Sequence, residues 1–112
     1  MQEKKGLNEL TGKAEEYLEA IFNITEEKGY SKMKDIASAL EVSVPSVIEM
    51  VKKLDDMDFV IYRKYDGVTL TPKGETIGGI IKYRSDMIKA FSGMIKVVEK
   101  IADKKAFTEN ET

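Results

Sequence analysis

Residues 32–74 read KMKDIASALEVSVPSVIEMVKKLDDMDFVIYRKYDGVTLTPKG, and this stretch decides the fold. Its first half contains two apolar stripes with helical spacing, separated only by residues 41–44. The stripes consist of Met33, Ile36, Ala37 and Leu40, and then of Val47, Met50, Val51 and Leu54. A connection this short predicts two helices that cross at a steep angle, as in a helix-turn-helix.

Polar residues and a proline mark where the two helices begin. Ser31 precedes the first stripe, and its hydroxyl is suited to cap the free backbone N–H groups of a first turn. Either Ser43 or Ser46 can cap the second helix in the same way. Pro45 fits only a first helical turn, so the second helix is expected to start close to it.

A β-hairpin is predicted after the second helix. Residues 59–65 and 68–71 are rich in β-branched and aromatic side chains. Asp66-Gly67 between them is a strong signal for a two-residue hairpin turn. Pro72 cannot donate to a sheet ladder, so it ends the second strand and starts a new helix. Helix, turn, helix and hairpin in this order predict a winged helix-turn-helix, in which the hairpin is the wing.

A helix is expected upstream of the winged segment. Residues 12–28 have apolar side chains at helical spacing, Thr11 is a suitable N-terminal cap, and Gly29 is a suitable C-terminal stop. The polar residues 1–11 are expected to be loose. The winged helix-turn-helix domain is therefore assigned to residues 12–74, and the fold class is mainly α with a small β-hairpin.

Helical spacing resumes after the wing over residues 75–107. Gly93 interrupts this run, and a glycine inside a helix costs up to about 1 kcal/mol relative to alanine, so a break there into two C-terminal helices is expected. The apolar stripe needs a second surface, and we expect it to form the contact of a homodimer. Its residues are Ile88, Phe91, Ile95, Val98 and Ile101. Residues 108–112 are expected to be disordered.

The alternative for these C-terminal residues is a monomer. In that case the last helix folds back on Tyr17 or Phe22 of its own chain.

Composition narrows the classes of function. At 112 residues with 42% hydrophobic side chains, the chain is long enough for one domain. There is no cysteine, no signal peptide and no long apolar run, which predicts a cytoplasmic protein without a membrane segment. The sequence contains no histidine, which removes the commonest general base and the commonest transition-metal ligand. We therefore predict that the protein is not an enzyme.

The second helix of the pair is the one that such motifs place in the major groove of double-stranded DNA. If its apolar stripe faces inward, the groove side is formed by residues near the helix start and along the opposite face. The residues predicted to contact DNA are Ser43, Pro45, Ser46, Glu49, Lys52 and Lys53 of this helix, and Arg63, Lys64 and Tyr65 of the wing. Lys32 and Lys34 are further candidates near phosphates.

The net charge of the chain supports DNA binding less directly than the order of the predicted elements does. The formal net charge is −2, and residues 31–74 hold seven Lys or Arg against seven Asp or Glu. Binding must then depend on local placement of the basic residues rather than on net charge. Glu49 either accepts a hydrogen bond from a base or argues against DNA binding. The alternative function is a winged-helix module for protein association, for which a neutral charge is natural.

Five segments carry a resemblance to a known family: EEYLEAIFNI, KDIASALEVS, VIEMVKKL, IYRKYDGVTLTPKGETIG and KYRSDMI. Over residues 13–95 the chain resembles the N-terminal part of the metal-dependent repressors related to the diphtheria toxin repressor and the manganese transport regulator. The resemblance implies a homodimer that represses metal-uptake genes from a two-fold operator when a divalent metal binds.

The resemblance also implies where a metal would bind. Glu16 and Glu19 match carboxylate ligands of the family, whereas Ser85 stands where the family has a histidine. Two carboxylates hold a hard cation weakly, so we expect an incomplete metal site that binds no metal, or at most manganese or iron weakly. The alternative is that Glu16 and Glu19 belong to an ordinary solvated helix face.

Overall fold

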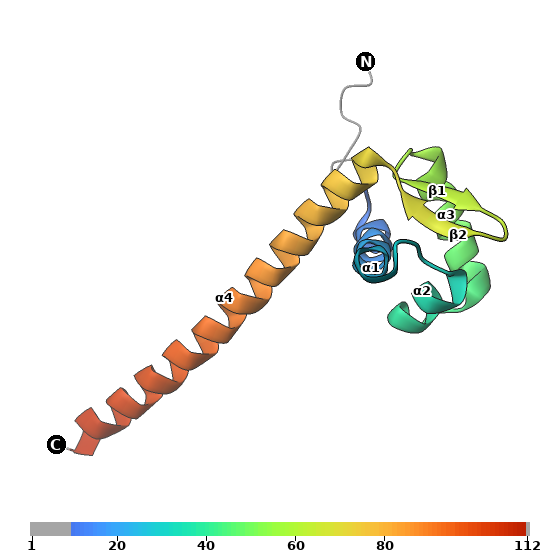
Figure 1. Ribbon diagram of the computed structural model, residues 1–112. Helices are drawn as coiled ribbons and strands as arrows, with labels where there is room; N and C mark the ends of the chain where they lie inside the picture. Colours follow the sequence, from blue (N-terminus) through green and yellow to red (C-terminus); the bar gives the residue numbers. More distant parts are fainter. Residues whose placement is uncertain (1–9, 112) are drawn as a thin grey trace. The chain divides into compact units, whose positions relative to one another are not determined.

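The computed structural model describes the backbone of residues 10–111 and the side chains of residues 10–103. The sequence predicted a loose segment over residues 1–11, of which residues 1–9 lie outside the described residues, as does the last residue, Thr112. Of the other two, Leu10 packs against the core and Thr11 caps α1. The described elements follow one another as α1 (Gly12–Lys28), α2 (Met33–Leu40), α3 (Val44–Asp56), β1 (Val60–Arg63), β2 (Gly67–Leu70) and α4 (Pro72–Glu111) (Figure 1). The prediction of a mainly helical fold with one antiparallel hairpin is confirmed.

Both ends of α1 have the predicted caps. The Thr11 hydroxyl oxygen accepts the Ala14 N–H at 3.1 Å, and Gly29 takes a left-handed conformation with φ 86°. The Gly29 N–H donates to the Thr25 carbonyl at 2.7 Å. The helix buries one face, formed by Ala14, Tyr17, Leu18 and Ile21. These residues belong to the hydrophobic core, where they pack against the winged segment.

The α2 and α3 helices form the predicted helix-turn-helix. Glu41 ends α2 in a left-handed conformation with φ 55°, and Ser43 caps the start of α3, with Pro45 in its first turn. The two helices contribute the centre of the core, formed by Ile36, Ala37, Val47, Val51 and Leu54. Burial of these side chains provides the main driving force for packing α2 against α3.

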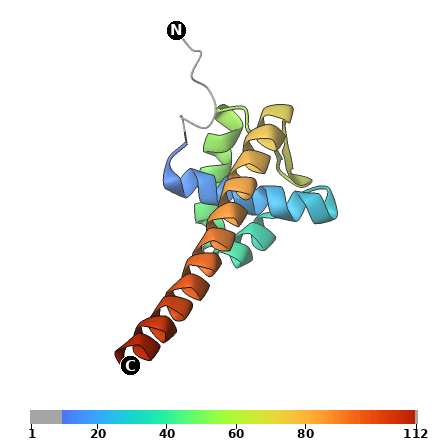
Figure 2. The same cartoon turned by 90° about the vertical axis from the view of Figure 1, so that its left-hand side faces the viewer.

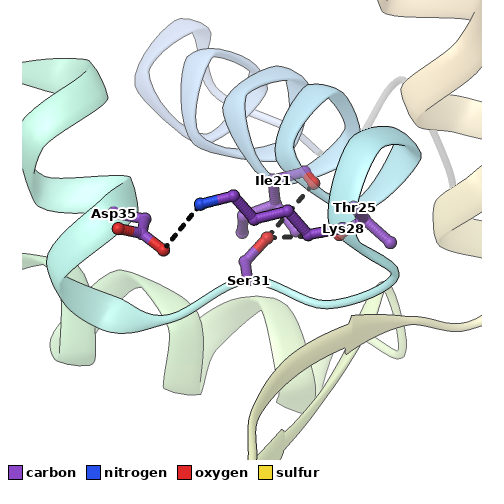
Figure 3. Close-up of polar contacts among 5 residues, drawn as sticks. All are labelled: Ile21, Thr25, Lys28, Ser31 and Asp35. Atoms are coloured by element: carbon purple, nitrogen blue, oxygen red, sulfur yellow. Dashed lines mark hydrogen bonds and ion pairs between the residues drawn. The ribbon is translucent and has the colours of Figure 1, made fainter.

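Ser31 has a different role from the predicted helix cap (Figure 3). The N-terminal cap of α2 is Lys32, which makes no side-chain capping bond. Ser31 is fully buried, and its backbone N–H and C=O pair with Val68 at 2.8 and 2.7 Å. Its hydroxyl donates to the Ile21 carbonyl at 3.3 Å and lies 3.2 Å from the Thr25 hydroxyl. Because buried polar groups need partners, this network fixes Ser31 beside the hairpin instead.

The hairpin turn is also longer than predicted. Arg63 pairs with Gly67, so Gly67 belongs to β2, and the connection consists of the three residues from Lys64 to Asp66. Gly67 has φ 95°, as expected for the residue that closes a three-residue hairpin loop. A Cβ at Gly67 would lie 2.6 Å from the Ser31 carbonyl oxygen. Glycine is therefore required by both the conformation and the close approach.

The sequence Thr71-Pro72-Lys73-Gly74 connects the wing to α4 through specific contacts. The Thr71 hydroxyl donates to the Asp58 carbonyl at 2.6 Å and accepts the Gly74 N–H at 2.9 Å. The Lys73 ammonium donates to the Met57 carbonyl at 2.8 Å and lies 4.3 Å from the centroid of the Phe59 ring. These contacts join the first turn of α4 to the segment that leads from α3 into β1.

The break predicted at Gly93 is not present, since α4 is one helix from Pro72 to Glu111 (Figure 1). A single glycine weakens a helix but keeps its backbone N–H and C=O, so the hydrogen-bond ladder continues through it. The helix also includes residues 108–111, where the sequence predicted disorder. The chain divides into two compact units, residues 1–81 and 82–112, so α4 begins in the first unit and continues into the second. Among the described residues, no helix is long and apolar enough to cross a membrane.

Gly74 tests the contact between α4 and the winged segment. We expect Gly74→Ala to destabilise the chain by about 1–3 kcal/mol, because the added methyl group would overlap the Phe59 carbonyl oxygen. The control is Gly93→Ala, which meets no heavy atom within 4 Å and should stabilise the helix by up to about 1 kcal/mol. Urea unfolding of both variants measures the difference. Equal midpoints would contradict the close packing at Gly74.

Candidate nucleic-acid interface

The outward face of α3 has the composition that the sequence predicted. All six predicted contact residues of this helix and its cap are exposed, namely Ser43, Pro45, Ser46, Glu49, Lys52 and Lys53. On the opposite side Val47, Val51 and Leu54 are fully buried, and Met50 is half-buried. One side of α3 is therefore sealed into the core while the other presents hydroxyl, carboxylate and ammonium groups to solvent.

The start of α3 is organised by two serine hydroxyls. The Ser43 hydroxyl oxygen accepts the Ser46 N–H at 3.3 Å, and the Ser43 hydroxyl donates to the Ser46 hydroxyl oxygen at 2.9 Å. Ser43 is therefore the cap, which settles the alternative between these two serines. Since Ser46 accepts rather than donates in this pair, its own hydroxyl hydrogen remains available to an acceptor such as a phosphate oxygen.

The wing is held against α3 by a contact that the sequence did not reveal. A carboxylate oxygen of Asp55, in the last turn of α3, accepts the backbone N–H of Tyr62 in β1 at 2.8 Å. We call the outward side of α3, from Ser43 to Lys53, the recognition face. The charge-assisted bond from Asp55 fixes the hairpin relative to this face. No spacing rule identifies Asp55, because the pairing depends on where β1 returns past the helix.

The predicted wing residues lie at the tip of the hairpin. Arg63, Lys64 and Tyr65 are all exposed, and Tyr65 has 89% of its surface accessible. The Lys64 ammonium lies 5.5 Å from the centroid of the Tyr65 ring. A tyrosine this exposed next to two cations is suited to contact with another molecule rather than to packing within the hairpin.

A basic hollow of about 560 Å³ lies between the wing and the start of α2. Its polar lining includes Tyr30, Lys32, Lys34, Lys64, Tyr65 and Asp66. Three lysines and one carboxylate give this surface a local positive charge, although the winged segment as a whole is neutral. Lys32 and Lys34 were candidates from the sequence, whereas Tyr30 was missed because it precedes the first apolar stripe.

A second hollow, of about 190 Å³, lies between the start of α1 and the recognition face. It is lined by Lys13 and Tyr17 of α1 and by Ser46, Glu49, Met50 and Lys53 of α3. Figure 2 shows the first turns of α1, in blue, beside α3, in green. Lys13 therefore joins the recognition face from a distant part of the sequence. Only the packing of α1 against α3 could identify it.

The carboxylates implied by the resemblance share one face of α1. Glu16 and Glu19 line a hollow of about 270 Å³ together with Asn23 and residues at the end of α2. The described residues contain no group of three or more Asp, Glu, His or Cys side chains that could hold a metal ion. Ser85, which takes the histidine's place, belongs to the second unit. The donor groups here do not fit a tight manganese or iron site, which needs more protein ligands.

The five residues predicted for dimerisation are exposed on α4. Phe91 is 63% accessible, and even Ile95, the least exposed of them, is 42% accessible. Met87 and Met94 extend the same apolar stripe. Because α4 continues through Gly93, the reversal that the monomer alternative needs at that position is not formed.

The fold and the recognition face define a winged helix-turn-helix protein of the DNA-binding class. Residues 9–68 match the family model described as "Iron dependent repressor, N-terminal DNA binding domain". The match covers more than half of the chain, and the chain belongs to this family. The family consists of transcriptional regulators and not of enzymes.

Curated relatives agree with the family assignment. The chain is 45% identical over 89 residues to the "HTH-type transcriptional regulator MntR" of Geobacillus thermodenitrificans, a match over 80% of this chain and 63% of the relative. It is 47% identical over 94 residues to the regulator of the same name from Bacillus pumilus, over 83% of this chain and 65% of the relative. The chain thus spans less than two thirds of the length of these relatives.

Solved structures support the fold. The manganese regulator SloR is 39% identical, with a TM-score of 0.51 over 62% of this chain and 32% of that chain. MepR of Staphylococcus aureus, solved as a complex with DNA, has a TM-score of 0.58 over 73% of this chain and 61% of that chain. At 17% identity, the likeness to MepR shows the winged-helix fold alone.

Proposed function

We propose that this chain is a transcriptional repressor that binds double-stranded DNA as a homodimer, in the cytoplasm, on an operator with two-fold symmetry. The observation that carries the proposal is the recognition face of α3. It is exposed, it starts with two hydroxyl residues, it carries two adjacent lysines, and Asp55 ties it to the wing. The names of the MntR relatives support regulation of transcription.

In the proposed complex, α3 enters the major groove with its N-terminal half towards the base edges. The Ser46 hydroxyl and the ammonium groups of Lys52 and Lys53 contact phosphate oxygens, which fixes the register of the helix on the duplex. Ser43 donates its hydroxyl hydrogen to Ser46, so it lies beside the duplex as the residue that holds the start of α3 in place. Pro45, beside them, is exposed at the helix start and contacts the duplex through its ring.

The wing and the basic hollow supply the neighbouring contacts. Arg63, Lys64 and Tyr65 reach the adjacent backbone or minor groove. Lys32 and Lys34 lie around the same hollow as Lys64, so one strand of phosphates can run across all three lysines. This local clustering offsets the net charge of −2 in the DNA-bound state.

The apolar stripe of α4 is proposed as the dimer contact. An exposed run of large apolar side chains is unusual in a monomer and marks an association surface. A pair of such stripes forms an isologous contact, and the symmetry of the pair then matches a two-fold operator.

Control by manganese or iron is proposed to be weak or absent in this chain. One similar solved protein is the manganese regulator SloR, but in this chain Glu16 and Glu19 offer only two carboxylates, and the sequence contains no histidine. Such a pair binds a hard cation only weakly.

The lysines of the recognition face are tested by salt dependence. Lys52→Ala with Lys53→Ala should weaken binding to operator fragments selected from random DNA. It should also make the slope of log affinity against log salt shallower by about 1.8, because two phosphate contacts are lost. Fluorescence anisotropy at several salt concentrations measures the slope. The control, Lys89→Ala with Lys96→Ala, removes the same charge from exposed sites on α4 and should keep the original slope.

An unchanged slope in the Lys52 and Lys53 variant would refute the phosphate contacts. If the wild-type chain also failed to retain any DNA, the protein-association function would be the better account.

The dimer is tested by thermal unfolding at increasing protein concentration. The melting temperature of the wild type should rise with concentration, because association stabilises the folded state by mass action. Phe91→Asp with Val98→Asp should remove this dependence. Lys100→Asp, whose position lies on the opposite side of α4, should keep it. A wild-type melting temperature that is independent of concentration would rule out the dimer in the range tested.

The metal proposal is tested with DNA fragments at fixed salt. Binding affinity should be the same with added Mn²⁺ or Fe²⁺ and with a chelator. A gain of about tenfold with either metal would correspond to about 1.4 kcal/mol of coupling and would show a working metal switch. Glu16→Gln with Glu19→Gln is the matched control and should behave like the wild type.

A further inference from the structure

We propose that Glu49 selects a cytosine in each half-site of the operator. The inference rests on the proposed function, and it assigns a base to a residue whose role the sequence left open. It follows from where the carboxylate lies, which groups surround it and which base edges can donate to it.

Glu49 lies in the middle of the recognition face, where it is accessible to a base. It is exposed, and it is the sixth residue of α3, beyond the two serines that occupy the helix start. In the part of the chain whose side chains are described, its carboxylate makes no hydrogen bond or ion pair. Lys53 follows it by four residues, a spacing that favours an ion pair on a helix, yet the two groups remain separate. Both carboxylate oxygens are therefore free to accept.

The surroundings of Glu49 reduce the repulsion that a carboxylate meets near phosphates. The hollow that it lines brings together two lysines, Lys53 from α3 and Lys13 from the first turn of α1. Lys52, three residues along α3, adds a third exposed cation to the same side of the helix. Asp56 is exposed two turns further along the same side of α3 and adds a second carboxylate. The three lysines outnumber the two carboxylates, so the local charge of this surface is positive although Glu49 is acidic.

In this arrangement the lysines contact phosphates, whereas Glu49 reads a base. Long ammonium side chains at the edge of the hollow suit the phosphates on either side of the groove, which position the helix. The shorter carboxylate between them lies over the groove, where sequence is read. Lys13 is then a positioning contact, because it neutralises the surroundings of Glu49 without touching a base.

A carboxylate can only accept hydrogen bonds, so it discriminates among bases by their donors. In the major groove guanine presents N7 and O6, and thymine presents O4, all of which are acceptors that repel a carboxylate. Adenine presents a donor at N6 but an acceptor beside it at N7. Cytosine presents the N4 amino group without a neighbouring acceptor of its own. Cytosine is therefore the base that Glu49 fits best.

The test is selection of bound duplexes from random DNA with the full chain and three variants. Glu49→Gln keeps the size of the side chain and adds donors, so it should change the preferred base at one position of each half-site from cytosine to adenine. Glu49→Lys should change it to guanine. Asp56→Asn is the matched control, because it removes the same charge from another exposed residue of α3 and should select the wild-type sequence.

Competition binding then measures the size of the effect. Wild-type protein should discriminate against the other bases at this position by at least about fivefold, and Glu49→Gln should lose this discrimination for cytosine. Lys13→Ala should lower the affinity for every sequence while keeping the preference for cytosine. Circular dichroism of each variant checks that the exposed substitutions leave the fold intact.

The outcomes separate this inference from the proposed function. If wild type and Glu49→Gln select the same sequence, Glu49 reads no base, and the inference fails while DNA binding stands. If the wild type selects no sequence at all, both fail. A change of preference at one symmetric pair of positions, seen with Glu49→Gln but not with Asp56→Asn, supports both.

Discussion

The structure depends on one hydroxyl that connects three segments. Thr71 donates to the Asp58 carbonyl at 2.6 Å, where the chain leaves α3, and accepts the Gly74 N–H at 2.9 Å, where α4 begins. Since Thr71 directly follows β2, the same residue also sets where the hairpin ends. Burial makes these bonds costly to break, because an unpaired buried donor or acceptor costs about 1–3 kcal/mol. These bonds therefore hold the end of α3, the end of the wing and the first turn of α4 together.

The packing of separate elements explains how a chain with net negative charge can form a basic surface. The lysines that matter are contributed by separate elements, Lys13 by α1, Lys53 by α3 and Lys64 by the hairpin. Each is followed two positions later by an acidic residue, so counts along the chain average the charges out. Attraction to a phosphate falls off over roughly one Debye length, about 8 Å at physiological salt. The local arrangement of charged side chains therefore determines the attraction to DNA more than the net charge of the chain does.

The sequence predicted the parts of the fold that depend on local patterns. Helix spacing and caps identified α1, α2 and α3 and the outward face of α3, including Ser43 and Lys52. The sequence-based prediction failed where tertiary contacts override a local signal. Ser31 resembles a cap but pairs with Val68, and Gly67 pairs with Arg63 in β2 instead of forming part of the turn. Lys13 and Asp55 carried no local signal, since both act through a neighbouring element.

The arrangement of the two candidate metal ligands limits what any bound cation could control. A ligand shifts a conformational equilibrium only by the difference in its affinity for the two states. Glu16 and Glu19 are one turn apart on the same rigid helix, so a cation held by them alone keeps the same two contacts however α4 is arranged. Control would need a third donor from another element, and Ser85 is a poor replacement for an imidazole. The winged fold and its recognition face are complete without that donor, so loss of metal control is compatible with DNA binding.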